Sequence, residues 1–327
     1  MTLTRQSLKI HRAAYASIQD GGRFGFESIG VGRAGFADAR HAELANLLVG
    51  NSPNSALIEI FAGAFEADFL CDIDFSTAGA VADLRLDGVA VQIGARVRAR
   101  RGQRLSLKQV SAGRILYLAL AGGIELAPVL GSLSTDLDSA FGGLQGRLLR
   151  ALDELSTTPA TTNLPISRAW LAPNLPDHTP LRIMVAHNCP EELAAQFLDA
   201  KWRISPQSQR SGMRLQTAAA DLPMNPPEHD GISRGVVPGV IQLPPNGLPI
   251  VLGVDAQTVG GYFVLGVVIA VDLWRIAQAV PGQIASFQVV SIEQAQALSQ
   301  AARALRARLE LAILTQAKPL AADFIDV

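Results

Sequence analysis

Short runs in which apolar and polar residues alternate dominate the chain, and glycine, proline and aspartate separate these runs. The alternation is clearest from Val81 to Ala121, where VADLRLDGVAVQI repeats with a period of two around Asp87-Gly88. Asp-Gly between two such runs is the strongest short-range signal for a β-hairpin. Leu3 to His11 and Ala56 to Ile60 predict further strands. The pattern therefore predicts a succession of short strands, typical of a barrel or a sandwich.

Helical patterns are few and short in the first half of the chain. Asp38 is a good N-cap for a helix over Ala39 to Val49, because Leu44, Leu47 and Leu48 then fall on one face. Gly50 and Asn51 follow as a stop signal.

The second half repeats the same alternation of strands and short helices. LRIMVAH predicts a strand, and CPEELAAQFL predicts a short helix with Pro190 in its first turn. A β-rich block follows from Trp202 to Val290. Ser291 then opens a capping box with Gln294, and the helix behind it continues to about Leu311.

A polar stretch rich in proline and threonine, from Ser156 to Pro180, is the best candidate for a domain linker. We therefore expect an N-terminal β domain over residues 1–160, a linker over 161–180, and a C-terminal β domain over 181–311 that ends in a helix. Residues 312–327 form a tail. Two β-rich blocks with one short helix each suggest a duplicated domain.

Composition and charge narrow the function classes. Hydrophobic residues make up 49% of the chain and charged residues 17%, which supports a large packed core. The formal net charge of -1 gives no electrostatic signature for nucleic acid or an anionic membrane. Cys71 and Cys189 make no disulfide framework, and the first residues carry no apolar signal core. We expect a cytoplasmic protein without a nucleic-acid or membrane partner.

The common catalytic signatures are absent from the sequence. GxxxxGK[ST] does not occur, so an ATP site would not be a P-loop, and GxSxG does not occur either. The five histidines are scattered, and no metal site is expected.

Glycine-rich polar segments are the remaining candidates for chemistry. In the segment from Ser17 to Asp38, the backbone N–H groups of glycine turns can form anion-binding nests, and Asp20 and Arg23 can pair or contact a ligand. A purely structural loop explains the same residues. Asn51 flanks the end of the predicted helix, and Glu59 in an apolar strand needs a partner or a function.

A hydroxyl and carboxylate cluster lies beside glycines between Ala121 and Arg147. Ser132, Ser134, Thr135 and Asp136 can hold a phosphate or a small polar substrate, or they can cap a helix. In the second half, Arg210 and Arg214 are the natural clamps for carboxylate or phosphate.

The segment from Gly235 to Phe263 is the most unusual in the chain, because polar residues recur between apolar strand residues and turn glycines. Asp255 follows a buried-looking strand, where a carboxylate is a candidate for chemistry. The other polar residues of this segment are Gln242, Gln257, Thr258 and Tyr262. A β-hairpin with polar turn residues is the alternative.

Taken in order, these segments resemble the biotin-dependent carboxyltransferase (allophanate hydrolase subunit 2) family. The segments are SIQDGGRFG with GVGRAGFAD, NLLVGN, GSLSTD with FGG and GR, SQRSGMRL, and PGVIQLPPNGLPIVLGVDAQTVGGY. The set is specific, and it covers roughly Leu3 to Phe287. Within that family the chain is most similar to the C-subunit type of bacterial ATP-dependent 5-oxoprolinases. The resemblance implies a mainly β fold with short helices, arranged as two cyclophilin-like β-barrel domains.

The resemblance also implies an activity, namely ATP-dependent opening of 5-oxoproline to L-glutamate together with partner subunits of the A and B types. ATP with Mg²⁺ would be shared with those partners, and the chain alone would be inactive. The residues expected to act in catalysis are Asp255, Arg210 and Arg214. The residues expected to bind substrate or ATP are Asp20, Arg23, Asn51, Ser132, Thr135, Asp136, Gln242, Gln257, Thr258 and Tyr262. We expect the arginines and Asp255 to meet in one anion-lined pocket formed by both halves.

Two alternatives remain open. The first is biotin-dependent carboxyl transfer to a urea-like or amide substrate, which would need a separate carrier because no biotinyl-lysine motif occurs here. The second is a non-catalytic regulator of a kinase inhibitor. The chain departs from the family pattern at Leu133, Leu152, Gln209 and Met213. The departures at Leu133 and Gln209 favour the regulator slightly.

Overall fold

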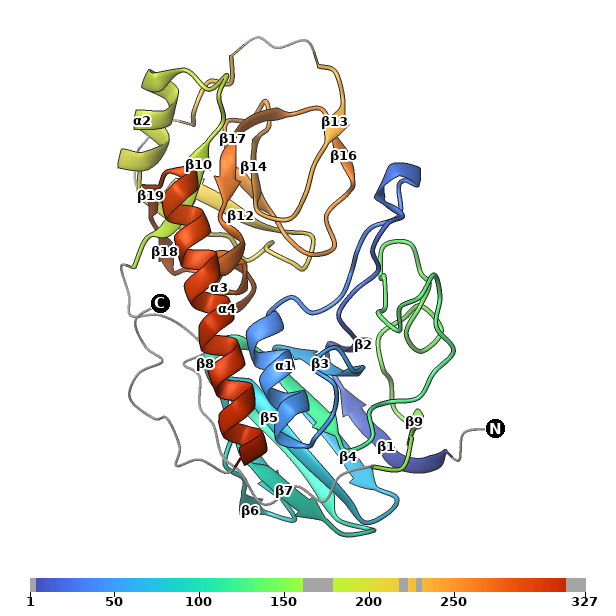
Figure 1. The fold of residues 1–327 in the computed structure, drawn as a ribbon. Coiled ribbons are helices and arrows are strands. Elements are labelled where there is room, and N and C mark those ends of the chain that lie inside the picture. The colour runs from blue at the N-terminus through green and yellow to red at the C-terminus, as the bar shows by residue number, and fades with distance from the viewer. Residues whose placement is uncertain (1–3, 161–178, 218–222, 228–230, 316–327) are drawn as a thin grey trace. The chain divides into compact units, whose positions relative to one another are not determined.

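The computed structural model describes residues 4–160, 179–217, 223–227 and 231–315 (Figure 1). These residues fall into two compact units. Of the described residues, unit 1 takes 4–23, 34–160 and 304–315, and unit 2 takes 24–33, 179–217, 223–227 and 231–303. Both units are mainly β, as the alternating sequence pattern predicts.

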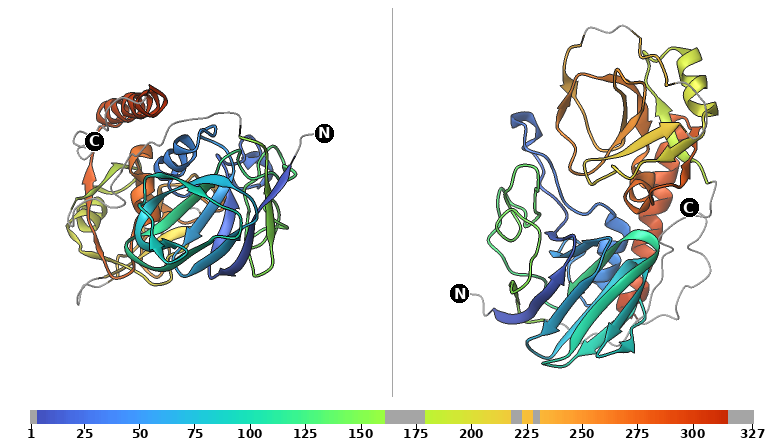
Figure 2. Two further views of the ribbon diagram at one scale, coloured as in Figure 1. Left: turned by 90° about the horizontal axis from the view of Figure 1, so that it is seen from below. Right: turned by 180° about the vertical axis from the view of Figure 1, so that it is seen from behind.

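Unit 1 is built on one antiparallel sheet that curls into a half-barrel (Figure 2). Along the sheet the order is β2-β3-β8-β4-β1-β9, and β5 pairs with β6, β7 and β8. The strands are β1 (Arg5–Ala13), β2 (Ala16–Gln19), β3 (Leu57–Phe61), β4 (Phe65–Phe69), β5 (Ile73–Leu86), β6 (Val89–Ala90), β7 (Arg96–Ala99), β8 (Arg104–Leu120) and β9 (Glu154–Thr157). The sheet curls because β8 pairs with β4 at its beginning, with β3 near its end, and with β5 along its length.

The predicted hairpin at Asp87-Gly88 is confirmed. Leu86 pairs with Val89, and Asp87 and Gly88 have φ angles of 48° and 81°. Positive φ at both central positions is what a two-residue turn matching the strand twist requires. The prediction placed the start of this strand at Val81, whereas β5 begins eight residues earlier. The earlier residues from Ser76 to Ala80 are buried on both faces and lack the apolar–polar alternation, so the alternating pattern could not be followed back to Ile73.

Helix α1 (Ala39–Leu48) confirms the predicted helix and its cap. The side chain of Asp38 accepts a hydrogen bond from the backbone N–H of His41. Leu44 and Leu48 are buried. Ser76 Oγ of β5 donates to the carbonyl oxygen of Ala45 at 2.5 Å, which fastens the helix to the sheet.

Unit 2 contains a nearly closed barrel with the strand order β18-β11-β12-β15-β14-β17-β10-β19. The two end strands, β18 (Ile284–Ala285) and β19 (Phe287–Val289), are separated in sequence by one residue, so the sheet must bend round until its ends approach each other. The remaining strands are β10 (Leu181–Val185), β11 (Trp202–Ile204), β12 (Gly212–Thr217), β14 (Val240–Leu243), β15 (Ile250–Leu252) and β17 (Phe263–Val268). A separate ribbon pairs β13 (Arg234–Gly235) with β16 (Val259–Gly260).

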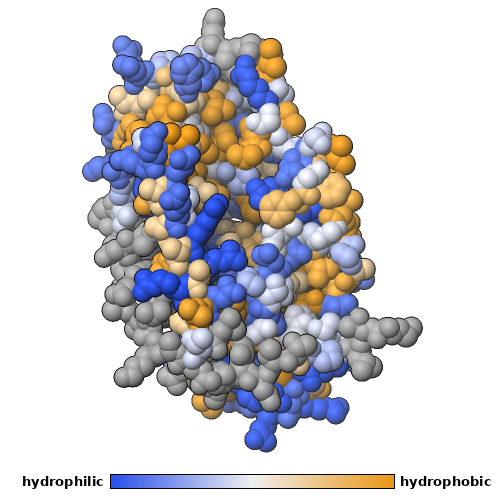
Figure 3. Space-filling model, viewed as in Figure 1, coloured by the Kyte–Doolittle hydropathy of each residue, from blue (hydrophilic) through white to orange (hydrophobic). Residues whose placement is uncertain are grey.

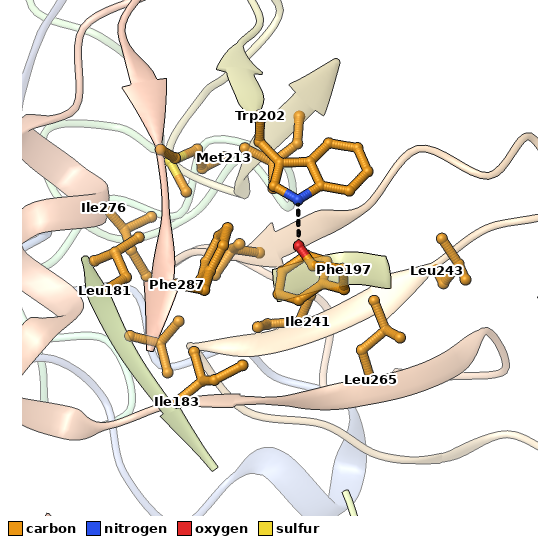
Figure 4. Packing of buried hydrophobic residues seen from close by; sticks show 14 of the residues in the cluster. Leu181, Ile183, Phe197, Trp202, Met213, Ile241, Leu243, Leu265, Ile276 and Phe287 are labelled. Atoms are coloured by element: carbon orange, nitrogen blue, oxygen red, sulfur yellow. Dashed lines mark hydrogen bonds between the residues drawn. The ribbon is translucent and has the colours of Figure 1, made fainter. Parts of the chain in front are cut away.

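The core of unit 2 forms inside this barrel around three aromatic rings (Figure 4). The rings of Phe197 and Phe287 lie 4.5 Å apart between centroids, and those of Phe197 and Trp202 lie 5.7 Å apart. Trp202 is 1% exposed, and its indole N–H donates to the carbonyl oxygen of Phe197 at 2.9 Å. The buried indole therefore keeps a hydrogen-bond partner, as a tryptophan in a core usually does.

Helix α2 (Glu191–Asp199) confirms the predicted helix, with Pro190 at the N-cap and not inside the first turn. The short helix α3 (Leu273–Gln278) and the 3₁₀ turns η1 (Glu27–Ile29) and η2 (Ala270–Asp272) were not predicted. The prediction described Trp202 to Val290 as a β-rich block and named no helix within it. Six helical residues without a capping side chain give too short a signal for a periodicity to reveal.

Helix α4 (Ile292–Thr315) confirms the predicted capping box. Ser291 N donates to Gln294 Oε1 at 2.8 Å, and Gln294 N donates to Ser291 Oγ at 3.2 Å. The helix runs four residues beyond the predicted end at Leu311. Many polar side chains cover its outer face (Figure 3). Arg306 on this helix pairs with Glu43 of α1 at 2.9 Å.

The predicted linker lies mostly outside the described residues, which omit 161–178. Its predicted beginning is wrong in one respect, because Ser156 and Thr157 belong to β9 and pair with β1. Thr157 is fully buried, and its hydroxyl lies 2.7 Å from Ser7 Oγ of β1, so a polar residue here does not mark an exposed linker. Among the described helices, none is both long enough and apolar enough to cross a lipid bilayer.

Candidate functional site

Asp20 anchors the predicted hydroxyl cluster of unit 1. It follows β2, and its carboxylate accepts hydrogen bonds from Ser132 Oγ at 2.6 Å and Ser134 Oγ at 2.5 Å. The same carboxylate accepts from the backbone N–H of Leu133 at 2.6 Å and of Gly22 at 2.9 Å. The structure therefore brings Asp20 and the serines together, although more than a hundred residues separate them in sequence.

The neighbouring members of this cluster bind backbone groups. Thr135 donates through its amide and its hydroxyl to the carbonyl oxygen of Ile18, each at 2.9 Å. Asp136 accepts from the backbone N–H of Ser139 at 2.9 Å and closes a local turn. Both side chains are buried. Their observed contacts fix the loop that follows Val129 against β2.

Arg23 is 1% exposed and lies against the same loop. Its Nε donates to the carbonyl oxygen of Val129 at 3.1 Å, and one terminal nitrogen donates to that of Ser134 at 3.0 Å. Its guanidinium lies 4.5 Å from the ring centroid of Phe141. Arg23 thus fastens the loop at three points, and its role as an anion clamp stays a prediction.

Asn51 joins the end of α1 to the end of β8. Its amide nitrogen donates to Asn46 Oδ1 at 3.1 Å and to the carbonyl oxygen of Leu120 at 2.8 Å. Its amide oxygen accepts from the backbone N–H of Gly122 at 2.9 Å. These three bonds use both ends of the side chain, so a ligand at Asn51 would have to replace one of them.

In unit 2 the structure pairs two of the predicted catalytic residues with each other. Arg210 Nε donates to Asp255 Oδ2 at 2.6 Å, and a terminal nitrogen donates to Asp255 Oδ1 at 2.8 Å. The side chains are 2% and 7% exposed. A bidentate pair of this kind is the strong form of the arginine–carboxylate contact. It fixes the turn before β12 to the turn after β15.

Arg214 lies on β12 and is exposed. Its backbone N–H donates to Ser208 Oγ at 3.0 Å, and its carbonyl oxygen accepts from the backbone N–H of Ser205 at 2.9 Å. The main chain at Arg214 is therefore fixed while its guanidinium reaches solvent. Of the predicted anion clamps, Arg214 is the one whose charge is open to an approaching ligand.

Gln242 and Gln257, both predicted to bind substrate or ATP, contact each other in the structure. Gln242 lies on β14 and is 1% exposed. Its Oε1 accepts from Gln257 Nε2 at 3.4 Å, and Gln257 is exposed. Thr258 accepts a hydrogen bond at its carbonyl oxygen from the backbone N–H of Val236 at 2.9 Å. Tyr262 is 47% exposed just before β17.

The predicted residues thus form local clusters within each unit. Asp20, Arg23 and the hydroxyl cluster belong to unit 1, whereas Arg210, Asp255 and the glutamine pair belong to unit 2. A pocket that combines the arginines of both halves stays a prediction. Among the described residues, no group of three or more histidine, cysteine, aspartate or glutamate side chains could hold a metal ion.

The sequence analysis missed a buried network at the start of α1. Glu59 is 1% exposed and accepts from Tyr117 Oη at 2.9 Å and from the backbone N–H of Ala37 at 3.0 Å. Tyr117 Oη in turn accepts from the backbone N–H of Asp38 at 2.7 Å, and Asp38 Oδ2 lies 2.5 Å from His41 Nδ1. The sequence signal that could have indicated this network is the spacing of Asp38 and His41, which places the two side chains within one helical turn. Glu59 has the partners that its burial requires.

Glu43, one turn further along α1, is a carboxyl group whose pKa is raised clearly by burial. Burial raises the pKa of Glu43 to about 6, and the nearby carboxylate of Asp38 adds to the rise. The charge of Arg306 opposes it. This carboxyl therefore titrates in a range where an ordinary glutamate is fully charged.

Comparison with known proteins gives a family match over most of the chain. The family described as "Carboxyltransferase domain, subdomain A and B" matches residues 29–289. The C subunit of the 5-oxoprolinase of Escherichia coli (strain K12) is 40% identical over 292 residues, which cover 88% of this chain and 93% of that protein. The C subunit of the Haemophilus influenzae 5-oxoprolinase is 34% identical over 287 residues, or 86% and 90% of the two chains.

Longer relatives contain the same region as one part of their length. The urea amidolyase of Saccharomyces cerevisiae is 30% identical over 314 residues, which cover 88% of this chain but 17% of that protein. The crystal structure of TTHA0988 has a TM-score of 0.77 and 31% identity, and this chain spans 56% of its length. The Kluyveromyces lactis urea carboxylase, at 24% identity and a TM-score of 0.77, shares the fold.

Proposed function

The chain belongs to the carboxyltransferase domain family with subdomains A and B, and on that basis we propose that it is the C subunit of a 5-oxoprolinase. The observation that carries the proposal is the 40% identity to the Escherichia coli protein of that name over 93% of its length. Nearly the whole of each chain takes part in the match. The similarity therefore spans nearly all of that relative and is not limited to one shared domain.

In the proposed reaction, 5-oxoproline is hydrolysed to glutamate. The bond between the ring nitrogen and the carbonyl carbon breaks, and the oxygen of water joins that carbon to form the side-chain carboxylate. The nitrogen takes up protons and becomes the ammonium group of glutamate. An amide carbonyl is a weak electrophile, so we propose that the assembled complex couples this step to ATP with Mg²⁺.

The hydroxyl cluster of unit 1, as it is bonded in the structure, offers a poor fit to the phosphates of ATP. The hydroxyls of Ser132 and Ser134 donate to the carboxylate of Asp20, and an approaching phosphate would meet that negative charge. Arg23 donates to backbone carbonyl oxygens next to them. We therefore place the ATP site with partner subunits of the A and B types, and we assign no step on this chain to the nucleotide.

Unit 2 supplies the residues that we propose for substrate handling. Arg214 is exposed on β12, so its guanidinium can bind the carboxylate of 5-oxoproline through charge-assisted hydrogen bonds. The pair of Arg210 and Asp255 holds the turns beside it in place. Asp255 would take part in proton transfer only after it releases Arg210, because both of its carboxylate oxygens accept from that guanidinium.

The test of this proposal is to co-express the chain with A-type and B-type partner subunits and to measure glutamate formed from 5-oxoproline. We expect turnover by the complex with ATP and Mg²⁺, and none by this chain alone or by the complex without ATP. Glutamate production by the lone chain would contradict the division of labour between subunits. A reconstituted complex that forms no glutamate would contradict the function itself.

A second function, biotin-dependent carboxyl transfer, is favoured by one observation. The urea amidolyase of Saccharomyces cerevisiae is 30% identical to this chain over 314 residues. Such a reaction needs a biotin carrier, and no biotinyl-lysine motif occurs in this sequence. Avidin separates the two functions, because it would stop a carboxybiotin-dependent reaction and leave hydrolysis of 5-oxoproline unchanged.

A further inference from the structure

The side-chain amide of Gln242 is an unusual feature of the barrel in unit 2. The residue is 1% exposed, and its Nε2 has no hydrogen-bond partner among the described residues. A buried donor without an acceptor is costly, and most such groups in folded proteins are satisfied. A cost of this kind is retained when the donor serves a ligand or a bound water molecule.

The backbone around Gln242 departs from a regular sheet. In the pairing of β14 with β17, Ile241 lies opposite Gly266 and Gln242 lies opposite Val264, so Leu265 of β17 is an extra residue. This is a β-bulge, which alters the direction of neighbouring side chains and occurs often beside functional sites. The bulge lies at the one residue of β14 that carries an amide.

A glycine lets the backbone of β16 approach this amide closely. A Cβ atom at Gly260 would lie 2.4 Å from Gln242 Nε2, so any larger residue there would displace the amide. Gly260 belongs to β16, and its backbone lies beside the Gln242 side chain of β14. The residue that faces Gln242 Nε2 therefore has no side chain that could accept its hydrogen bond.

Gln257 covers the other end of the amide only loosely. Its Nε2 donates to Gln242 Oε1 at 3.4 Å, near the upper limit for a hydrogen bond, and its side chain is exposed. A weak bond to an exposed surface side chain costs little to replace. When Gln257 turns away, Gln242 presents a donor and an acceptor side by side.

A donor and an acceptor side by side match one chemical class of ligand. In a cyclic amide the N–H and the C=O lie on the same edge, so Gln242 can accept from the first and donate to the second. An open-chain product with an ammonium group no longer has this edge. We propose that Gln242 recognises the amide edge of a cyclic amide substrate, with Gln257 as the side chain that moves aside.

This inference rests on the proposed function for the identity of the substrate, which would be 5-oxoproline. Recognition of the amide edge would explain how the site prefers the closed ring to glutamate. A site built to form hydrogen bonds rejects analogues that lack the matching group, because its own buried polar atoms are then left unpaired.

The test uses the full chain assembled with its partner subunits and measures binding by calorimetry and turnover by glutamate release. The binding probes are 5-oxoproline, 2-pyrrolidinone, and N-methyl-2-pyrrolidinone, which lacks the N–H. We expect the first two to bind at one competitive site and the N-methyl compound to bind at least about tenfold more weakly. We expect Gln242→Leu to weaken binding of 5-oxoproline by about tenfold or more and to raise KM by a similar factor.

The matched control is Gln216→Leu, which removes an exposed glutamine from β12. It should leave binding and KM unchanged, and thermal unfolding should show that both variants remain folded. Unchanged binding in Gln242→Leu, equal binding of the N-methyl compound, or no binding of any probe would overturn the inference.

The two proposals fail in different ways. Binding of cyclic amides through Gln242 without glutamate formation would refute the 5-oxoprolinase function and support the recognition site. Glutamate formation with a KM that Gln242→Leu does not change would refute the site and support the function.

Discussion

Removing one partner of the pair between Arg210 and Asp255 is expected to destabilise unit 2 strongly. The pair joins the turn before β12 to the turn after β15 through two hydrogen bonds, at 2.6 and 2.8 Å. With 2% and 7% of the side chains exposed, a single substitution leaves the other charge buried. The informative set is Arg210→Met, Asp255→Leu and the double variant that combines them.

The magnitude follows from the burial of the pair. Breaking a buried ion pair by removing one partner costs about 3–5 kcal/mol, whereas replacing both partners with apolar residues of similar volume is often neutral or stabilising. Each single variant should therefore lose about 3–5 kcal/mol, and the double variant should lose far less than the sum. The interaction energy from this cycle should be about 3 kcal/mol or more.

Urea titrations with tryptophan fluorescence can measure this effect in unit 2. Trp202 and Trp274 are 1% and 5% exposed in that unit, so their emission should change when it unfolds. Trp170 lies outside the described residues, and a Trp170→Phe background removes its contribution. The control pair is Glu27 with Arg33, whose nearest atoms are 3.9 Å apart and whose side chains are each 40% exposed.

We expect no measurable interaction energy for the exposed control pair, because solvent screens it. A loss below about 1 kcal/mol in either single variant of the buried pair would refute the reasoning. So would a double variant whose loss equals the sum of the single losses. Because Arg210→Ala and Asp255→Ala should each destabilise unit 2, part of any fall in turnover would come from unfolded protein. The measured turnover of these variants must therefore be corrected for the unfolded fraction.

Two further predictions concern unit 1. Because the pKa of Glu43 is raised to about 6 from 4.5, the folded state keeps a proton that the unfolded chain releases. The stabilising effect of this proton is present below pH 4.5 and is lost as the pH rises through 6. The free energy of unfolding should thus fall by about 2 kcal/mol over that range, and Glu43→Gln should remove this part of the slope in urea titrations. A slope that Glu43→Gln leaves intact would contradict the assignment. The second prediction compares two glycines of one loop, Gly131 and Gly142, whose φ angles are 78° and 71°. A Cβ atom added to Gly142 would lie 2.1 Å from the carbonyl oxygen of Ser134. A Cβ atom added to Gly131 would meet no atom within 4 Å. Gly131→Ala should cost about 1–2 kcal/mol for its backbone angle, and Gly142→Ala should cost at least about 2 kcal/mol more, so equal losses would be inconsistent with the packing.

Short sequence motifs correctly predicted the helix caps and the hairpin turn, because these structures depend only on residues close together in the chain. Asp38 as an N-cap, the turn at Asp87-Gly88 and the capping box at Ser291 all depend on groups within four residues. Each carries a chemical signature that other conformations do not favour. These elements were therefore predictable without knowledge of the rest of the fold.

The contacts of the candidate site depend on groups that are far apart in sequence. Asp20 binds Ser134 across 114 residues, and Arg210 binds Asp255 across 45. Their residue types marked them as candidates, but strand order and register decide which of them meet. The sequence could therefore identify the polar segments, and it could not show that Asp20 binds serines or that Arg210 binds Asp255.

The central claim, that this chain is a working part of a 5-oxoprolinase, is tested most directly by adding it back to its partners. Purified A-type and B-type subunits would be mixed with ATP, Mg²⁺ and 5-oxoproline, and glutamate would be measured before and after addition of this chain. We predict that glutamate appears only after the addition and rises with the amount of chain until the partners are saturated. Equal glutamate formation with and without this chain would contradict the account.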